Sequence, residues 1–184
     1  MKLRIRVATL LLLCLGGTAT AEVKDSAADG FTLENSVEVA VDADTAWRAL
    51  VGEVDRWWPK GHTWWGAQSR LRIEPRAGGC FCEIAGDRQA RHMQVVFVEP
   101  GKLLRMTGGL GPLQGMGVDG VLEFRLAEAG EGATRITLFY RAGGYAPDDL
   151  AGFAPVVDKV QAMQLGGLAD HLRAEGGAAG GGDR

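Results

Sequence analysis

The tryptophans are the most concentrated group of chemically distinctive residues in this chain, and all five lie within residues 47–65. Trp58, Trp64 and Trp65 fall in predicted loops or at a helix end, beside His62. Aromatic side chains in such positions capture apolar or ring-bearing molecules, and an indole N–H can also bond a polar group. The cluster therefore predicts either the mouth of an apolar cavity or aromatic packing that closes one end of the fold.

His62 is the histidine that the sequence places best for acid–base chemistry, because it lies within this aromatic segment. His92 falls in a predicted strand, and His171 lies near a predicted helix end, where the helix dipole favours a cation. There is no G-x-S-x-G, H-E-x-x-H or Walker motif, so His62 or an inward-pointing acid is the candidate catalytic group. Four charged residues in predicted strands could point inward: Glu83, Arg91, Arg105 and Glu123.

Cys80 and Cys82 are two positions apart in a predicted strand, which places both side chains on one face. In a regular strand their Cα atoms would be about 6.6 Å apart. That is the long limit of disulfide geometry, so a bridge requires a bulge. Three interpretations are open: two small core residues, which we favour, a redox-active disulfide, or a metal site completed by His62 or His92. Because no ligand spacing typical of a metal site is present, we predict no metal and no cofactor.

The first 21 residues have the three parts of a cleavable export signal. Basic residues precede an apolar stretch, Val7–Leu15, and Ala19-Thr20-Ala21 is a small-x-small cleavage site. The apolar stretch is shorter than the roughly 20 residues that span a bilayer. We expect cleavage after Ala21 and a periplasmic or secreted protein without a membrane anchor.

Charge and composition restrict the remaining chain to one globular domain. The formal net charge is −3, and removal of Lys2, Arg4 and Arg6 changes it to −6. Nucleic acid is therefore not an expected partner. Four segments are predicted: a signal peptide at 1–21, an N-terminal linker at 22–32, a folded domain at 33–174 and a disordered Gly-rich tail at 175–184.

Hydrophobic alternation predicts a sheet for most of the domain. Phe31–Val41 ends with valines on one face, which is typical of a half-buried strand, and two short helices follow it. Six more short strands lie between residues 70 and 141, and their short connections require antiparallel pairing. A long amphipathic helix then runs from Pro147 to Leu172. This order predicts an α+β fold in which about seven curved strands wrap one helix.

Four motifs follow one another along this domain: VDADTAW at 41–47, WWP at 57–59, IEPRAGG at 73–79 and EPGKLL at 99–104. Their order and spacing resemble the SRPBCC superfamily of START, polyketide cyclase and Bet v 1-like proteins, and within it the activators of the Hsp90 ATPase. The resemblance covers nearly all of residues 33–173 and implies a helix-grip fold. It does not imply one activity, because members bind lipids or sterols, cyclise polyketides or assist a chaperone.

The resemblance and the tryptophan cluster together lead us to expect a small apolar or aromatic ligand between the sheet and the C-terminal helix. A cyclase- or hydrolase-type enzyme that uses the same cavity is one alternative, and a protein-interaction module is another. Export would exclude the cytosolic chaperone as a partner. The sequence predicts neither the ligand's identity nor the oligomeric state. The residues expected to contact the ligand are Trp58, His62, Trp64, Trp65, Met93, Val95, Phe97, Phe153, Val157, Val160 and Met163.

Overall fold

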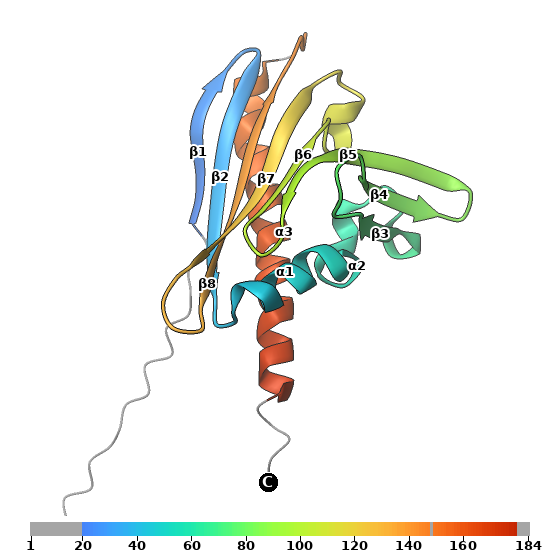
Figure 1. The fold of residues 1–184 in the computed structure, drawn as a ribbon. Helices are drawn as coiled ribbons and strands as arrows, with labels where there is room; N and C mark the ends of the chain where they lie inside the picture. Colours follow the sequence, from blue (N-terminus) through green and yellow to red (C-terminus); the bar gives the residue numbers. More distant parts are fainter. Residues whose placement is uncertain (1–19, 148, 180–184) are drawn as a thin grey trace, which may run out of the picture.

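One curved antiparallel sheet wraps around a long helix in the computed structural model, which describes residues 20–147 and 149–179 (Figure 1). The sheet has eight strands in the order β1-β2-β8-β7-β6-β5-β4-β3. The predicted α+β class and helix-grip arrangement are confirmed. The strands are β1 (Thr20–Ala27), β2 (Gly30–Val39), β3 (Arg70–Ile73), β4 (Cys80–Ala85), β5 (Arg88–Glu99), β6 (Leu103–Thr107), β7 (Asp119–Glu128) and β8 (Thr134–Gly143).

The predicted strand after residue 30 forms β2, which pairs with β8 through its whole length and packs against the long helix α3. Every second side chain of β2 is buried, including Leu33 and Val37, because one face of the strand covers the core. Leu33 lies opposite Tyr140 of β8 and Val37 lies opposite Ile136. These pairs form the centre of the inner face of the sheet.

An eighth strand lies where a linker was expected, so the prediction of a linker at 22–32 is wrong and the sheet has one strand more than the approximate number expected. β1 pairs antiparallel with β2 at the edge of the sheet. The side chains of 22–29 are exposed, apart from half-buried Val23, so the hydrophobic pattern gives no sign of a strand. An edge strand needs only backbone pairing on one side. The predicted signal peptide lies outside the described residues except for Thr20 and Ala21, which begin β1.

Short helices follow β2, as predicted, and precede β3. The side chain of Asp42 caps the first of them by accepting a hydrogen bond from Thr45 N at 2.7 Å. Trp47 and Trp57 are buried, and Trp57 Nε1 donates to Ala49 O at 3.0 Å. These two tryptophans therefore pack in the core. The α-helices are α1 (Ala43–Gly52) and α2 (Val54–Trp57), and single 3₁₀ turns form η1 (Lys60–His62), η2 (Gly66–Gln68) and η3 (Gly111–Gln114).

The C-terminal helix α3 (Leu150–Ala179) begins after Asp149, whose side chain accepts a hydrogen bond from Ala151 N at 2.9 Å. It continues through residues 175–179, which were assigned to a disordered tail, so that prediction is wrong for these five residues. An established helix gains one backbone hydrogen bond for each residue added, which carries it past the last buried residue. Residue 148 of the predicted helix and residues 180–184 of the predicted tail lie outside the described residues. Within the described ranges, no helix has the length and apolar character needed to cross a bilayer.

Cys80 and Cys82 form a disulfide, with their Cα atoms 5.4 Å apart. Both side chains are half-exposed, while Phe81 and Glu83 on the opposite face of β4 are buried. The favoured interpretation as two core residues is therefore wrong. The metal interpretation is also wrong, because each sulfur is bonded to the other. As the spacing required, the pairing of β4 with β5 is irregular here, and His92 is an extra residue on β5.

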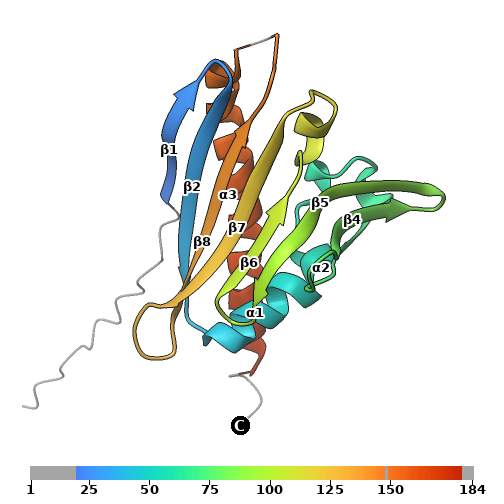
Figure 2. The ribbon, with the colours of Figure 1, turned by 45° about the horizontal axis from the view of Figure 1, so that its top comes forward.

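A second irregularity in β5 changes which side chains face the core. The pairing with β6 shifts between Val95 and Phe97, so the alternation of the strand reverses. Val95 is buried, whereas Phe97 points outward with 42% of its surface exposed. The prediction that Phe97 contacts a ligand inside the fold is therefore wrong. Figure 2 shows β5 with β4 as a long hairpin that projects beyond the neighbouring strands.

The helix α3 passes so close to the end of α2 that one of its residues has no room for a side chain. A Cβ on Gly167 would lie 2.4 Å from the carbonyl oxygen of Trp57, whereas a Cβ on Gly166 would meet nothing within 4 Å. Gly167 therefore allows the helix to pack directly on the backbone of α2, and the adjacent glycine has no such role.

We expect Gly167→Ala to lower the free energy of unfolding by about 1–3 kcal/mol, because the added methyl group forces α3 away from α2. Gly166→Ala is the matched control and should be neutral or stabilise by about 1 kcal/mol, since alanine favours the helix. Urea unfolding followed by circular dichroism measures both variants. Equal stabilities would contradict this account of the packing.

Candidate binding cavity

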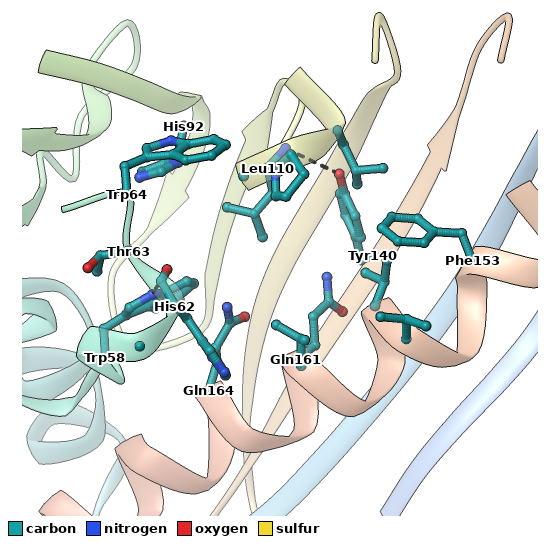
Figure 3. A pocket seen from close by; sticks show the side chains of 17 residues that line it. Trp58, His62, Thr63, Trp64, His92, Leu110, Tyr140, Phe153, Gln161 and Gln164 are labelled. Atoms are coloured by element: carbon teal, nitrogen blue, oxygen red, sulfur yellow. Dashed lines mark hydrogen bonds between the residues drawn. The ribbon is translucent and has the colours of Figure 1, made fainter. Parts of the chain in front are cut away.

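A cavity of about 420 Å³ lies between α3, the inner face of the sheet, the segment 58–64 and the loop 110–113 (Figure 3). Small-molecule sites in proteins commonly have volumes of about 300–1,000 Å³. None of its lining residues is Asp, Glu, Lys or Arg. The lining consists of Trp58, Gly61, His62, Thr63, Trp64, His92, Leu110, Gly111, Pro112, Leu113, Tyr140, Phe153, Val156, Val157, Val160, Gln161 and Gln164.

The floor of the cavity is one stripe of α3. Phe153, Val157 and Val160, predicted from their helical spacing, all lie on it. Met163 does not, because a rotation of about 100° per residue carries it beyond the edge of the stripe. Its side chain is 45% exposed. The prediction that Met163 contacts a ligand is therefore wrong.

The tryptophan segment contributes two of its three predicted side chains. Trp58 is buried in the wall, where its Nε1 donates to the carbonyl oxygen of His62 at 3.2 Å. Trp64 lies at the mouth and is 48% exposed. Trp65 turns away from the cavity, and its ring lies 5.3 Å from the guanidinium of Arg88. Placing Trp65 in the cavity was wrong, because the chain bends at Trp65 (φ −124°, ψ 17°) to enter η2 and does not continue past the mouth.

The carboxylate of Glu83 fixes this segment against the sheet. Glu83 is fully buried, and its Oε1 accepts hydrogen bonds from Trp64 N at 2.9 Å and from Trp65 N at 3.3 Å. Ser69 Oγ donates to the same oxygen at 2.5 Å. Four donors, counting His92, thus surround one buried carboxylate. A buried acid is tolerated only when such donors satisfy it.

His92 connects Glu83 to the cavity. Its Nε2 lies 2.8 Å from Glu83 Oε2, and its ring lines the cavity wall. Burial lowers the pKa of His92 below its ordinary value, and the hydrogen bond to Glu83 opposes that effect only in part. A neutral ring donates to the acid from Nε2, so we assign the free lone pair to Nδ1. No described residue forms a hydrogen bond with Nδ1 of His92.

The opposite wall carries the ring of Tyr140, whose Oη accepts a long hydrogen bond from Leu110 N at 3.5 Å. Burial raises the pKa of Tyr140 to about 12, so its hydroxyl keeps its hydrogen at neutral pH. A Cβ on Gly120 would lie 2.8 Å from this ring, so the glycine is needed to admit it. Leu113, in the loop above, is buried and closes the roof.

Three polar side chains in the lining have atoms without a hydrogen-bond partner. Gln161 is fully buried, and neither Nε2 nor Oε1 of its amide is bonded. The same holds for Oε1 of Gln164 and Nδ1 of His62. In Figure 3 the amides of both glutamines extend from α3 toward the interior of the cavity. These atoms are the open hydrogen-bonding groups of the site.

Two further predicted contact residues belong to the core and not to the cavity. Met93 and Val95 are buried beneath it, because the bulge in β5 brings His92 to the wall in their place. That prediction is therefore wrong for both. The charged strand residues also lie elsewhere: Arg105 pairs with Glu123 at 2.5 Å on the outer face, and Arg91 is exposed.

Sequence reasoning missed Tyr140, the roof loop and the two glutamines. Tyr140 follows Ile136 and Leu138 at a period of two, which is the signal of an inward face. Gln161 and Gln164 lie in a helical stripe that is otherwise apolar, and polar residues in such positions were the available signal for a polar site. The sequence pattern gives no sign that the loop 110–113 covers the cavity, because the position of this loop depends on how the chain folds back in three dimensions.

The family assignment agrees with this geometry. The sequence model of the family described as polyketide cyclase / dehydrase and lipid transport matches residues 30–173, so the chain belongs to this family within the SRPBCC superfamily. No curated protein matches the chain. The finer resemblance to activators of the Hsp90 ATPase stays a prediction.

Solved structures of low sequence identity share the fold. CalU16 from Micromonospora echinospora has a TM-score of 0.56 at 16% identity, over 87% of this chain and 88% of its own. A protein from Rhodobacter sphaeroides has a TM-score of 0.56 at 17% identity, over 84% and 99%. DynU16, from the dynemicin biosynthetic locus, has a TM-score of 0.55 at 18% identity, over 77% of this chain and 47% of its own. At these identities the likeness establishes the fold alone.

The lowered pKa of His92 predicts a loss of stability in mild acid. As the pH falls below about 6.5, the unfolded chain takes up this proton before the folded protein does. The free energy of unfolding should therefore decrease between pH 7 and pH 5. In His92→Gln, which keeps a donor for Glu83 but does not titrate there, the decrease should be smaller. Urea unfolding at each pH tests this, with His62→Gln as control because the ring of His62 forms no ion pair among the described residues, and an unchanged slope in His92→Gln would refute it.

Proposed function

We propose that this protein binds one small, apolar or ring-bearing molecule in the cavity, outside the cytoplasm. The observation that carries the proposal is a space of about 420 Å³, open at one side and lined largely by aromatic and aliphatic side chains, with Trp64 at its mouth. An apolar pocket of this size with a few convergent polar groups is the usual form of a small-molecule site. Membership of a family described by polyketide and lipid chemistry supports the same class of ligand.

The export part of the proposal rests on two features of the chain. The sequence before residue 22 has the pattern of a cleavable signal. The disulfide between Cys80 and Cys82 is of the kind that persists in oxidising compartments. Cleavage after Ala21 would leave β1 five of its paired positions with β2, beginning at Glu22, so the edge strand is compatible with processing.

Filling the cavity should abolish binding without unfolding the protein. The probe is N-phenyl-1-naphthylamine, a neutral dye that fluoresces in apolar surroundings. We expect the wild-type protein to bind one dye molecule, and Val160→Phe to bind it about tenfold or more weakly, because the added ring occupies the ligand's space. Met163→Phe adds a comparable ring to the exposed side of the same helix and should bind like the wild type. Equal affinities in all three proteins would refute the proposal.

A second candidate function is proton transfer within the same cavity. The specific observation is the pair of His92 and buried Glu83, since a carboxylate that orients a neutral imidazole is the arrangement of a general base. His62, the candidate from the sequence, also lines the cavity, but a hydrogen-bond partner for its ring is absent among the described residues. An enzyme would therefore use His92 in preference to His62.

The Kemp elimination of 5-nitrobenzisoxazole tests for such a base, because a base removes the proton on C3 while the N–O bond breaks to give a nitrile and a phenolate. If His92 is a general base, the wild type accelerates the reaction and His92→Gln lowers the rate by about 100-fold. His171→Gln is the control and should not change it. A wild-type rate no greater than that of His92→Gln would exclude catalysis by His92.

A further inference from the structure

The cavity holds hydrogen-bonding groups that the protein itself does not satisfy. Gln161 is fully buried with both ends of its amide free, and Gln164 is 4% exposed with a free Oε1. Neighbouring positions of the same stripe of α3 carry Val157 and Val160. Burying an unbonded amide is unfavourable, so an aliphatic residue would suit an empty or purely apolar site better. The amides indicate a partner inside the cavity.

The electrostatics of the wall restrict what that partner can be. No Asp, Glu, Lys or Arg lines the cavity. Glu83, which is hydrogen-bonded to His92 of the cavity wall, is already surrounded by donors. Arg105, whose strand position made it a candidate inward-pointing charge, lies on the outer face of the sheet and is paired with Glu123. A carboxylate, phosphate or ammonium group in the cavity would therefore lose its hydration without gaining a counter-charge, which is strongly unfavourable.

The two free ends of the Gln161 amide define the chemistry more closely. Nε2 donates and Oε1 accepts, so the complementary group must accept and donate side by side. Neutral carboxamides, lactams and adjacent hydroxyl–carbonyl pairs have this arrangement. Tyr140, on the facing wall, keeps a hydroxyl hydrogen that it can donate to the same molecule, because it only accepts in its hydrogen bond with Leu110 N.

We propose that the ligand is an uncharged apolar or ring-bearing molecule with a donor–acceptor edge of this kind, and that Gln161 is the residue that recognises the edge. The inference rests on the proposed binding function and narrows its ligand class. Gln164, on the same stripe of α3, and His62, in the segment 58–64, offer two more groups to a longer ligand.

Four probes with one ring system test the inference by calorimetric titration at pH 7.5: naphthalene, 2-acetonaphthone, 2-naphthamide and 2-naphthoate. Naphthalene has no polar group, and 2-acetonaphthone has an acceptor alone. 2-Naphthamide has a donor beside an acceptor, and 2-naphthoate has a negative charge. We expect 2-naphthamide to bind about fivefold more tightly than 2-acetonaphthone, which lacks the donor, and at least about tenfold more tightly than naphthalene, which lacks both groups, because each added hydrogen bond strengthens binding by about fivefold. We expect 2-naphthoate to bind most weakly.

The variant Gln161→Leu should reduce the affinity for 2-naphthamide to that for naphthalene, while naphthalene binds as well as before or better. Gln89→Leu, an exposed position in the β4–β5 hairpin, is the control and should leave every affinity unchanged. Retention of the preference for the amide in Gln161→Leu would overturn the inference. So would tightest binding of 2-naphthoate, or equal wild-type affinities for naphthalene and its amide.

The outcomes separate this inference from the function on which it rests. If N-phenyl-1-naphthylamine binds and none of the naphthyl probes does, the donor–acceptor assignment is wrong while the cavity is still a binding site. If the dye and all four probes fail to bind, the proposed function itself is wrong.

Discussion

The buried carboxylate of Glu83 is the constraint on which the rest of the site depends. It accepts hydrogen bonds from two consecutive backbone N–H groups of the tryptophan segment, from Ser69 and from His92. An acid so deep in the protein is stable only with donors on both oxygens, so it fixes a segment that would otherwise be a surface loop. The position of Trp64 at the cavity mouth and the orientation of His92 in its wall both follow from this one group.

Strand β4 carries a covalent cross-link on one face and a hydrogen-bonded carboxylate on the other. The outer face carries the disulfide, and the inner face presents Glu83 to the cavity wall. The bulge opposite this strand adds His92 to β5 and brings its ring inward. His92, Tyr140 and the two glutamines are thus held by strands and by the helix α3, while His62 lies in the segment 58–64 and apolar residues of a loop form the roof. Rigid elements position the hydrogen-bonding groups more accurately than loops can.

The fold could be predicted from the sequence because its motifs and its alternation of apolar residues agree. What could not be predicted has physical causes that local patterns do not reveal. β1 is an edge strand with exposed side chains, so it has no hydrophobic period. The bulge at Val96 reverses the alternation that assigned Phe97 to the interior. The aliphatic residues of α3 were predicted as cavity lining because helical spacing is regular, whereas the role of Gln161 depends on the absence of a partner in three dimensions.

The central claim is that the cavity is occupied by an uncharged molecule which bonds the amide of Gln161. The most direct measurement is a high-resolution crystal structure of the protein isolated from its own cells without unfolding. The account predicts electron density for one apolar molecule against Trp58 and Phe153, with a polar edge within hydrogen-bonding distance of Gln161. A cavity that contains only ordered water bonded to Gln161 and Gln164, or one closed by its own side chains, would contradict it.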